Sequence, residues 1–284
     1  MRFFAPAKLN LSLDLGPARR DGYHEIRSVM QAVSLGDRLF VMPAAALRVE
    51  NAEVPAGDLV ATAAQVFRKA TGVAPNVAIE VQKRIPIGAG LGGGSSDAAC
   101  TLRALRHLLL PTLPPEELLG MAGEIGSDVP FFLGAAPRAL AVGRGEVLTP
   151  LPPAEPRFVV IAWPGVGLAT ADVYRASRPG TGDATDRVLG GAERGPNDLE
   201  PAAARLCPEL GRLLGGAREA GVPLQVTGSG SAAFALYADP GEAVGALRSL
   251  KAIAPRVVLC QTLAAWPWQR RAPAADAAGQ AQVR

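Results

Sequence analysis

The stretch PIGAGLGGGSSDAA, residues 86–99, has five glycines within seven positions and decides how the chain folds around it. A strand-like run over residues 76–81 precedes it, and small apolar residues with helical character follow it. Glycine lets backbone N–H groups turn inward and lets a ligand approach closely. A helix that begins near Ser95 or Ser96 would direct its positive end at the same place. Because the flanking segments are regular and apolar, the pattern favours an anion-binding loop for nucleotide phosphates over a merely flexible loop.

Three common phosphate-binding patterns do not fit this loop. The P-loop pattern is absent because no lysine follows the glycines. Gly88, Gly90 and Gly93 satisfy G-x-G-x-x-G, but a dinucleotide fold also needs a strand that ends in an acid about 20 positions later, and none is expected there. The protein-kinase pattern fails as well, since Glu80 stands where its lysine would be.

The loop resembles the phosphate-binding motif of the GHMP kinases. APAKLNLSLDLG (5–16) and VTGSGSAAFALY (226–237) match the same superfamily. APAKLNL, DGYHEI (21–26) and GSDVPFFL (126–133) are most similar to members that phosphorylate the 2-hydroxyl of a methylerythritol conjugate of cytidine diphosphate, in the non-mevalonate isoprenoid pathway. The resemblance implies an α+β fold of two domains. The first would be like the second domain of ribosomal protein S5, and the second would be ferredoxin-like.

The composition is that of a globular protein in a reducing compartment. The chain has 284 residues, 49% of them hydrophobic, with a net charge of +3 and a pI of about 9.0. Cys100, Cys207 and Cys260 are far apart, and only two histidines occur, so neither a disulfide framework nor a zinc site is expected. With no signal peptide and no long apolar run, the prediction is a cytoplasmic protein that does not bind membranes.

The domain boundary is expected in the proline-rich segment LPPAEP, residues 151–156. This divides the chain into residues 1–152, residues 153–268 and a disordered tail over residues 269–284. Leucines at alternate positions predict a half-buried strand over residues 9–15, and Asp21 with Gly22 is a turn signal. Helices are predicted over residues 58–70, capped by Asp58, and over residues 240–253, capped by Asp239. Residues 178–196 are expected to be an open loop.

The resemblance assigns ATP to the glycine-rich loop. The implied ATP-binding residues are Pro86, Gly88, Ala89, Gly90, Leu91, Gly92, Gly93, Gly94, Ser95 and Ser96. A hydroxyl of Ser95 or Ser96 would contact Mg²⁺, or either serine would be a plain helix cap, and both roles stay open. Asp97 would cap the helix or face the metal.

Phosphoryl transfer also needs an aligned acceptor hydroxyl. By its motif, Asp128 in GSDVPFFL is the expected base that accepts the hydroxyl proton, although composition alone would make it a loop or cap residue. Lys8 in APAKLNL is its expected partner, because an ammonium would keep the carboxylate ionised and orient the hydroxyl. The alternative for Lys8 is a solvated lysine on a strand face.

Tyr23 and His24 are expected to recognise cytosine. An aromatic ring can stack on the base, and an imidazole can hydrogen-bond its polar edge. The resemblance places both in the cytidine pocket with Asn10 close by and Tyr174 on the other face of the base. Without the resemblance, His24 would be an ordinary turn histidine.

A second glycine–serine turn is expected to line the site from the C-terminal domain. Its residues are Gly228, Ser229 and Gly230. By resemblance this turn lies near the substrate diphosphate or the triphosphate, and Asn197 with Asp198 would order the adjacent loop. The alternative is a plain strand-to-helix connection.

The sequence therefore predicts a kinase that uses ATP and Mg²⁺ on a small-molecule substrate, acting as a monomer or weak homodimer. One alternative is another GHMP kinase, acting on homoserine, mevalonate or a sugar, which the Tyr23–His24 pair disfavours. A non-catalytic nucleotide-binding module is disfavoured because both Lys8 and Asp128 are present. An RNA-binding protein, suggested by the S5-like fold and the pI, is disfavoured because no basic stripe with aromatics occurs.

Overall fold

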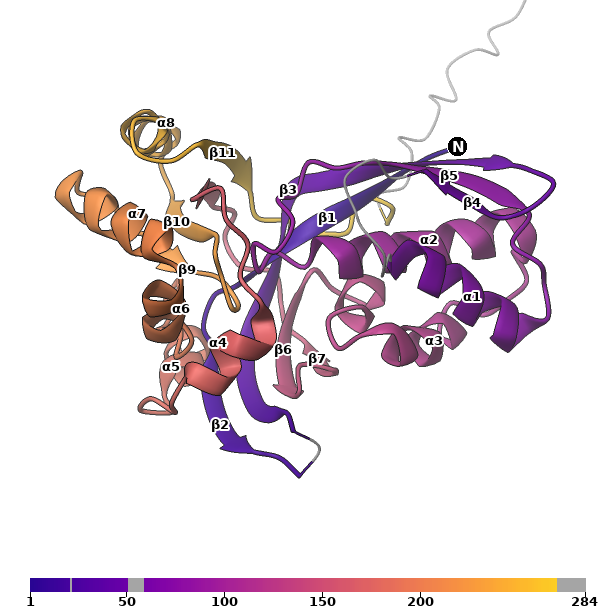
Figure 1. The fold of residues 1–284 in the computed structure, drawn as a ribbon, viewed down its shortest axis with the longest axis horizontal. Coiled ribbons are helices and arrows are strands. Elements are labelled where there is room, and N and C mark those ends of the chain that lie inside the picture. Colours follow the sequence, from indigo (N-terminus) through magenta and orange to yellow (C-terminus); the bar gives the residue numbers. More distant parts are fainter. Residues whose placement is uncertain (21, 51–58, 270–284) are drawn as a thin grey trace, which may run out of the picture.

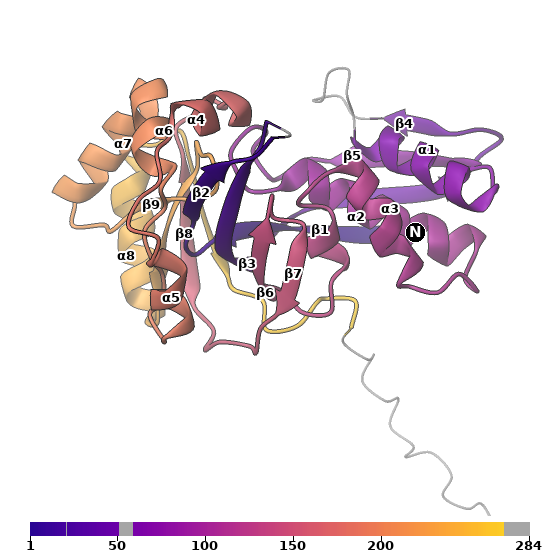
Figure 2. The same cartoon turned by 90° about the horizontal axis from the view of Figure 1, so that it is seen from below.

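The computed structural model describes residues 1–20, 22–50 and 59–269, which form two β-sheets with helices at both ends of the molecule (Figure 1). Figure 2 shows the sheets between helices α1–α3 at one end and α6–α8 at the other. The first sheet comprises β1 (Arg2–Asn10), β2 (Asp14–Ala18), β3 (His24–Pro43), β4 (Arg48–Glu50), β5 (Val77–Gln82), β6 (Arg138–Gly143) and β7 (Val147–Pro150). Its order is β4-β5-β3-β6-β7, and β1 and β2 also pair with the long strand β3.

Helices cover one face of the first sheet. They are α1 (Leu59–Thr71), α2 (Gly93–Leu109), α3 (Glu117–Ile125) and a 3₁₀ turn η1 (Pro130–Leu133). The apolar stripe of α1 buries Phe67, and β5 supplies Ile79 to the same core. This packing anchors α2 and η1, whose ends carry the two motifs GLGGGSSDAA and GSDVPFFL.

The second sheet comprises β8 (Phe158–Trp163), β9 (Gln225–Val226), β10 (Ala233–Tyr237) and β11 (Arg256–Gln261), all antiparallel in the order β11-β8-β10-β9. Its helices are α4 (Thr170–Ala176), α5 (Ala184–Leu189), α6 (Glu200–Leu206), α7 (Pro208–Glu219) and α8 (Pro240–Lys251). This strand order is that of a ferredoxin-like unit, as predicted for the second domain. The predicted two-domain α+β fold is confirmed. The predicted cap of the last helix is also confirmed, because the Asp239 carboxylate accepts from Glu242 N at 2.8 Å.

The two sheets share a hydrophobic core. Leu9 and Val29 from the first sheet pack in one cluster with Val159, Ile161 and Phe234 from the second. Burial of these side chains holds the sheets in a fixed relation. Residues of the two halves that face a common site are therefore held at fixed positions by this shared core.

After β11 the chain returns to the first half and buries Trp266 there. The indole is 0% exposed, packs edge-on against Phe131 at 5.7 Å between ring centroids, and donates its N–H to Gly134 O at 2.8 Å. Trp268 stacks on Trp266 at 4.9 Å, and the Arg103 guanidinium lies over Trp268. The predicted boundary between residues 152 and 153 falls between β7 and β8 and stays a prediction.

Two local predictions are wrong. Residues 9–15 are not one strand, because β1 ends at Asn10 and β2 begins at Asp14. Residues 178–196 are not an open loop, since they contain α5. The Asp14 carboxylate accepts from the first N–H groups of that helix, Ala184 N at 2.8 Å and Thr185 N at 2.9 Å. The predictions for Asp21, the Asp58 cap and residues 270–284 lie outside the described residues.

Candidate active site

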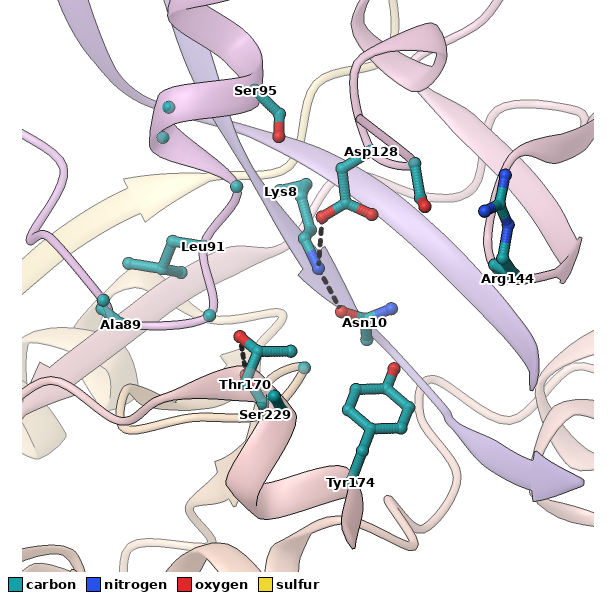
Figure 3. A pocket seen from close by; sticks show the side chains of 18 of the residues that line it. Lys8, Asn10, Ala89, Leu91, Ser95, Asp128, Arg144, Thr170, Tyr174 and Ser229 are labelled. Carbon is teal, nitrogen blue, oxygen red and sulfur yellow. Dashed lines mark hydrogen bonds and ion pairs between the residues drawn. The ribbon is translucent and has the colours of Figure 1, made fainter. Parts of the chain in front are cut away.

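A cavity of about 890 Å³ opens between the two halves (Figure 3). It is lined by every site residue that the sequence predicts except Ser96 and Gly230. The lining comes from β1, the loop before α2, the turn before η1, the start of β3, α4 and the turn after β9. Segments far apart in the chain thus converge on one space.

Lys8 and Asp128 form an ion pair in the lining of this cavity. The Lys8 ammonium lies 3.4 Å from Asp128 Oδ2 and donates to Asn10 Oδ1 at 2.5 Å. The Lys8 side chain is 6% exposed and that of Asp128 is 30% exposed, so the carboxylate is the member open to a ligand. Asn10 is fixed in turn because its Nδ2 donates to Ser28 Oγ at 2.8 Å. A buried ammonium therefore holds an accessible carboxylate in place.

The local fold around Asp128 explains its position. Helix α3 ends at Ile125, and Val129 N then donates to Gly126 O at 3.1 Å, which closes a turn around Ser127 and Asp128. Val129, Phe131 and Phe132 are at most 1% exposed and anchor the chain on the far side. The polar residue at the tip of this turn is thus directed into the cavity.

The glycine-rich loop departs from the prediction in where the helix starts. Helix α2 begins at Gly93, not at a serine, and its N-cap is Gly92 in the left-handed conformation with φ 70°. A Cβ at Gly92 would lie 3.0 Å from Lys8 Cγ and 3.1 Å from Phe132 Cζ, so only glycine allows this approach. Ser95 lines the cavity in the first helical turn (Figure 3). Ser96 is buried, and its Oγ has no partner among the residues that the structure describes.

The loop is held by the second glycine–serine turn. A Cβ at Gly90 would lie 2.4 Å from Thr227 O, and one at Gly228 would lie 3.0 Å from Gly90 O. Ala232 N also donates to Ala89 O at 3.0 Å. Asn197 supports the turn from behind, since its Nδ2 donates to Gly228 O at 2.9 Å. The glycine-rich loop is therefore shaped by residues of the C-terminal half.

Gly230 does not line the cavity, in contrast to the expectation for this turn. A Cβ there would lie 3.1 Å from Val226 Cγ1, which places Gly230 against the core side of the turn. Ser229 does line it, and its hydroxyl lies 3.0 Å from Thr170 Oγ1 at the start of α4.

Aromatic side chains occupy the opposite end of the cavity. The rings of His24 and Tyr174 lie 6.0 Å apart between centroids and are tilted by 35°. Tyr23 is 53% exposed, and the Arg144 guanidinium lies 5.0 Å from its ring centroid. Burial raises the pKa of Tyr174 well above its ordinary value, and the negative charge of Asp128 raises it further. Tyr174 is thus electrostatically coupled to the carboxylate.

Sequence reasoning missed a buried ionic cluster beneath the loop. The Lys83 ammonium donates to Asp37 Oδ2 at 2.5 Å and to Asp97 Oδ2 at 2.7 Å. Burial raises the pKa of Asp97 to about 7 against the opposing charge of Lys83. Burial lowers the pKa of Lys83, but the charges of Asp97 and Asp37 outweigh it and raise that pKa overall. Asp97 and Lys83 both line the cavity, so the acid next to the serines is neutralised by a lysine that no local pattern reveals.

The described part of the chain contains no group of three or more His, Cys, Asp or Glu side chains arranged to hold a metal ion. Within the same residues, each helix is too short or too polar to cross a membrane.

Comparison with known proteins places this architecture in a family. The family profile described as "GHMP kinases N terminal domain" matches residues 58–135, and that described as "GHMP kinases C terminal" matches residues 187–255. A protein of Pelotomaculum thermopropionicum named 4-diphosphocytidyl-2-C-methyl-D-erythritol kinase is 42% identical over 83% of this chain and 88% of its own length. A protein of the same name from Anaeromyxobacter dehalogenans is 40% identical over 87% of this chain and 84% of its own.

Solved structures agree with the sequence comparison. A 4-(cytidine 5'-diphospho)-2C-methyl-D-erythritol kinase has a TM-score of 0.79 at 38% identity, covering 92% of this chain and 99% of that one. The homoserine kinase of Cytophaga hutchinsonii has a TM-score of 0.69 at 19% identity, covering 93% and 94%, and so shares the fold alone. The chain therefore belongs to the GHMP kinase superfamily, in the family of the 4-diphosphocytidyl-2-C-methyl-D-erythritol kinases.

Proposed function

We infer that this chain is an ATP-dependent kinase that phosphorylates the 2-hydroxyl of 4-diphosphocytidyl-2-C-methyl-D-erythritol, in the non-mevalonate route to isoprenoid precursors. Relatives of that name cover most of the chain at about two-fifths identity. The observation that carries the proposal is the contact between Lys8 and Asp128 at 3.4 Å, in a cavity walled on one side by the glycine-rich loop.

Asp128 is the proposed base. Its carboxylate accepts the proton of the acceptor hydroxyl while that oxygen bonds to the γ-phosphorus of ATP, and the bond from this phosphorus to ADP breaks. Lys8 holds the carboxylate and donates toward the reacting oxygens, and Asn10 fixes the ammonium from the other side. Alignment of this kind accounts for most of the rate gain in phosphoryl transfer.

The loop and helix α2 are the proposed triphosphate site. The first turn of a helix leaves backbone N–H groups without intrahelical acceptors, and α2 directs its first turn at the cavity. Gly88, Gly90 and Gly92 have φ values of 66°, 77° and 70°, a run of left-handed residues that turns further N–H groups toward an anion.

Magnesium fits the same place. This ion needs few protein ligands, because it keeps waters and binds substrate phosphates. The Ser95 hydroxyl lines the cavity, and Asp97 Oδ1 is buried with no partner in the described part of the chain. These two groups would hold Mg²⁺, which neutralises charge on the β- and γ-phosphates when bound.

Tyr23, His24 and Tyr174 are the proposed cytosine site, with Asn10 between them and the reacting groups. An imidazole and two phenol rings offer stacking surfaces and a hydrogen bond for the polar edge of the base. Their grouping at one end of the cavity supports recognition of a pyrimidine there.

One assay separates this proposal from its competitors. Purified protein is incubated with ATP, Mg²⁺ and one acceptor at a time: the cytidine diphosphate conjugate, homoserine, mevalonate or galactose. ADP release and phosphorylated product are expected with the conjugate alone. Faster turnover of another acceptor would favour a different GHMP kinase. ATP binding without turnover of any acceptor would favour a non-catalytic module, and retention by RNA at moderate salt would favour an RNA-binding protein.

The proposed setting is the cytoplasm, with the enzyme active as a monomer or weak homodimer. Cys100, Cys207 and Cys260 are all free and buried, as a reducing compartment favours. The proposed catalytic pair, triphosphate site and cytosine site are all supplied by residues of this chain.

A further inference from the structure

Arg144 lies in the tight turn between β6 and β7, at the edge of the cavity. Gly143 and Gly145 on either side have φ values of 73° and 106°, so the turn depends on both glycines. Glu146 holds the arginine, because its carboxylate accepts from Arg144 N at 2.6 Å and from Arg144 Nε at 3.4 Å. The turn fixes the backbone of Arg144 at the edge of the cavity, and Glu146 also contacts its side chain.

The charges around the cavity single out this arginine. Four long cationic side chains line it: Lys8, Lys83, Arg144 and Arg175. Lys8 faces Asp128, and Lys83 lies between two carboxylates. Arg175 pairs with Asp172 at 2.8 Å, and its side chain is 76% exposed.

Among the described residues, the one ion pair of the Arg144 side chain is its 3.4 Å contact with Glu146, through Nε. Its two terminal nitrogens have no acceptor among the residues that the structure describes. A guanidinium with both Nη groups available is suited to a bidentate contact with a phosphate group.

The turn that carries Arg144 also adjoins both ends of the proposed substrate site. Its guanidinium lies over the Tyr23 ring, in the proposed cytosine site. The next residue in the turn adjoins the proposed base, since a Cβ at Gly145 would lie 3.9 Å from Asp128 Oδ1. Figure 3 shows Arg144 on the opposite side of Asp128 from the glycine-rich loop, away from the proposed triphosphate site.

The proposed substrate carries negative charge between its base and its reacting alcohol. In a nucleoside diphosphate conjugate, the diphosphate joins the base and ribose to the alcohol that reacts, so it must lie between the cytosine site and Asp128. We propose that Arg144 binds this diphosphate and makes the enzyme selective for a cytidine diphosphate conjugate over uncharged cytidine. The proposal rests on the proposed function, because it takes the two ends of the substrate from it.

The test compares cytidine with cytidine 5'-diphosphate (CDP) as ligands, with a non-hydrolysable ATP analogue and Mg²⁺ filling the triphosphate site. Calorimetry on the wild-type chain should show CDP binding at least about tenfold more tightly than cytidine, as expected for a charged hydrogen bond. In Arg144→Met, which keeps the chain length but removes the charge, this preference should fall to less than about threefold. Arg144→Lys should be intermediate, because a point charge lacks the bidentate geometry.

Two further variants make the result specific. His24→Ala changes only the proposed base site, so it should lower the affinities for cytidine and for CDP by the same factor. The preference for CDP should therefore remain. Arg175→Met removes the other arginine that lines the cavity, and this variant should keep the preference for CDP as well. Melting temperatures and the affinity for the ATP analogue confirm that each variant is folded.

Each outcome is decisive. If Arg144→Met lowers the affinities for cytidine and CDP by the same factor, Arg144 acts only through the Tyr23 ring, and the proposal is overturned. If Arg175→Met abolishes the preference instead, the diphosphate site is assigned to the wrong arginine. If the wild-type chain binds uridine and its diphosphate as tightly as the cytidine pair, the proposed function itself fails, whatever Arg144 does.

Discussion

Replacing Gly90 with alanine should weaken ATP binding strongly, because this glycine is where the two halves of the site touch. Gly90 has φ 77°, and a Cβ there would lie 2.4 Å from Thr227 O and 2.9 Å from Gly230 N and O. A Cβ atom rarely lies closer than 3.0 Å to another heavy atom. The glycine-rich loop and the turn after β9 must therefore separate by about 0.6 Å or more. Left-handed backbone strain adds about 1–2 kcal/mol.

The N–H groups of the loop would shift by a similar distance relative to the triphosphate. Loss of one hydrogen bond to a charged group costs about 1.5–3 kcal/mol, so we expect ATP affinity to fall by at least about tenfold. The assay is calorimetry with a non-hydrolysable ATP analogue, together with thermal denaturation. Gly221→Ala is the matched control, because Gly221 has φ 70° but no atom within 4 Å of its Cβ position. It should lower stability by about 1–2 kcal/mol through strain alone and leave ATP affinity unchanged. An unchanged affinity in folded Gly90→Ala would refute the idea that the C-terminal turn shapes the loop.

Three further predictions concern the reacting pair, the base site and the buried thiols. Asp128→Asn should lower kcat by at least about 100-fold in steady-state assays, because an amide cannot accept the hydroxyl proton, and near-normal turnover would remove Asp128 from the mechanism. His24→Ala should raise KM for the cytidine substrate far more than KM for ATP, and equal increases would contradict a base-specific role. Burial raises the pKa of Cys100 to about 11 and that of Cys260 to about 12, so both stay protonated below those values. A thiolate-selective reagent at about pH 8 should therefore label neither thiol until urea is added, and rapid native labelling of either would contradict its burial.

The linear motifs were predictable because their chemistry is local. A run of glycines before a helix indicates an anion site in any fold, and Asp239 caps α8 as its own sequence predicts. The pairing of Lys8 with Asp128 needed the family resemblance, since nothing local relates residues so far apart in the chain. The structure brings them to 3.4 Å.

The remaining features depend on tertiary contacts that no local pattern encodes. Serine is a better cap than glycine, so local preference starts α2 at Ser95. The approach of Lys8 and Phe132 to Gly92 instead fixes the start at Gly93. Likewise, α5 forms in a polar segment because Asp14, on a distant strand, satisfies its first N–H groups. The ion pair of Asp97 with Lys83 likewise depends on the tertiary fold and could not be predicted from the local sequence.

The position of Trp266 has a consequence for how the chain is made. Proteins emerge from the ribosome N-terminus first, and their early domains usually fold before the rest is synthesised. Here a fully buried indole that follows β11 completes the interior of the half that emerges first, and truncating such a side chain typically costs about 3–5 kcal/mol. The nascent N-terminal half therefore stays incompletely packed until residue 266 has been synthesised. Premature termination anywhere upstream of Trp266 should yield a loosely folded product that is readily cleared by proteases.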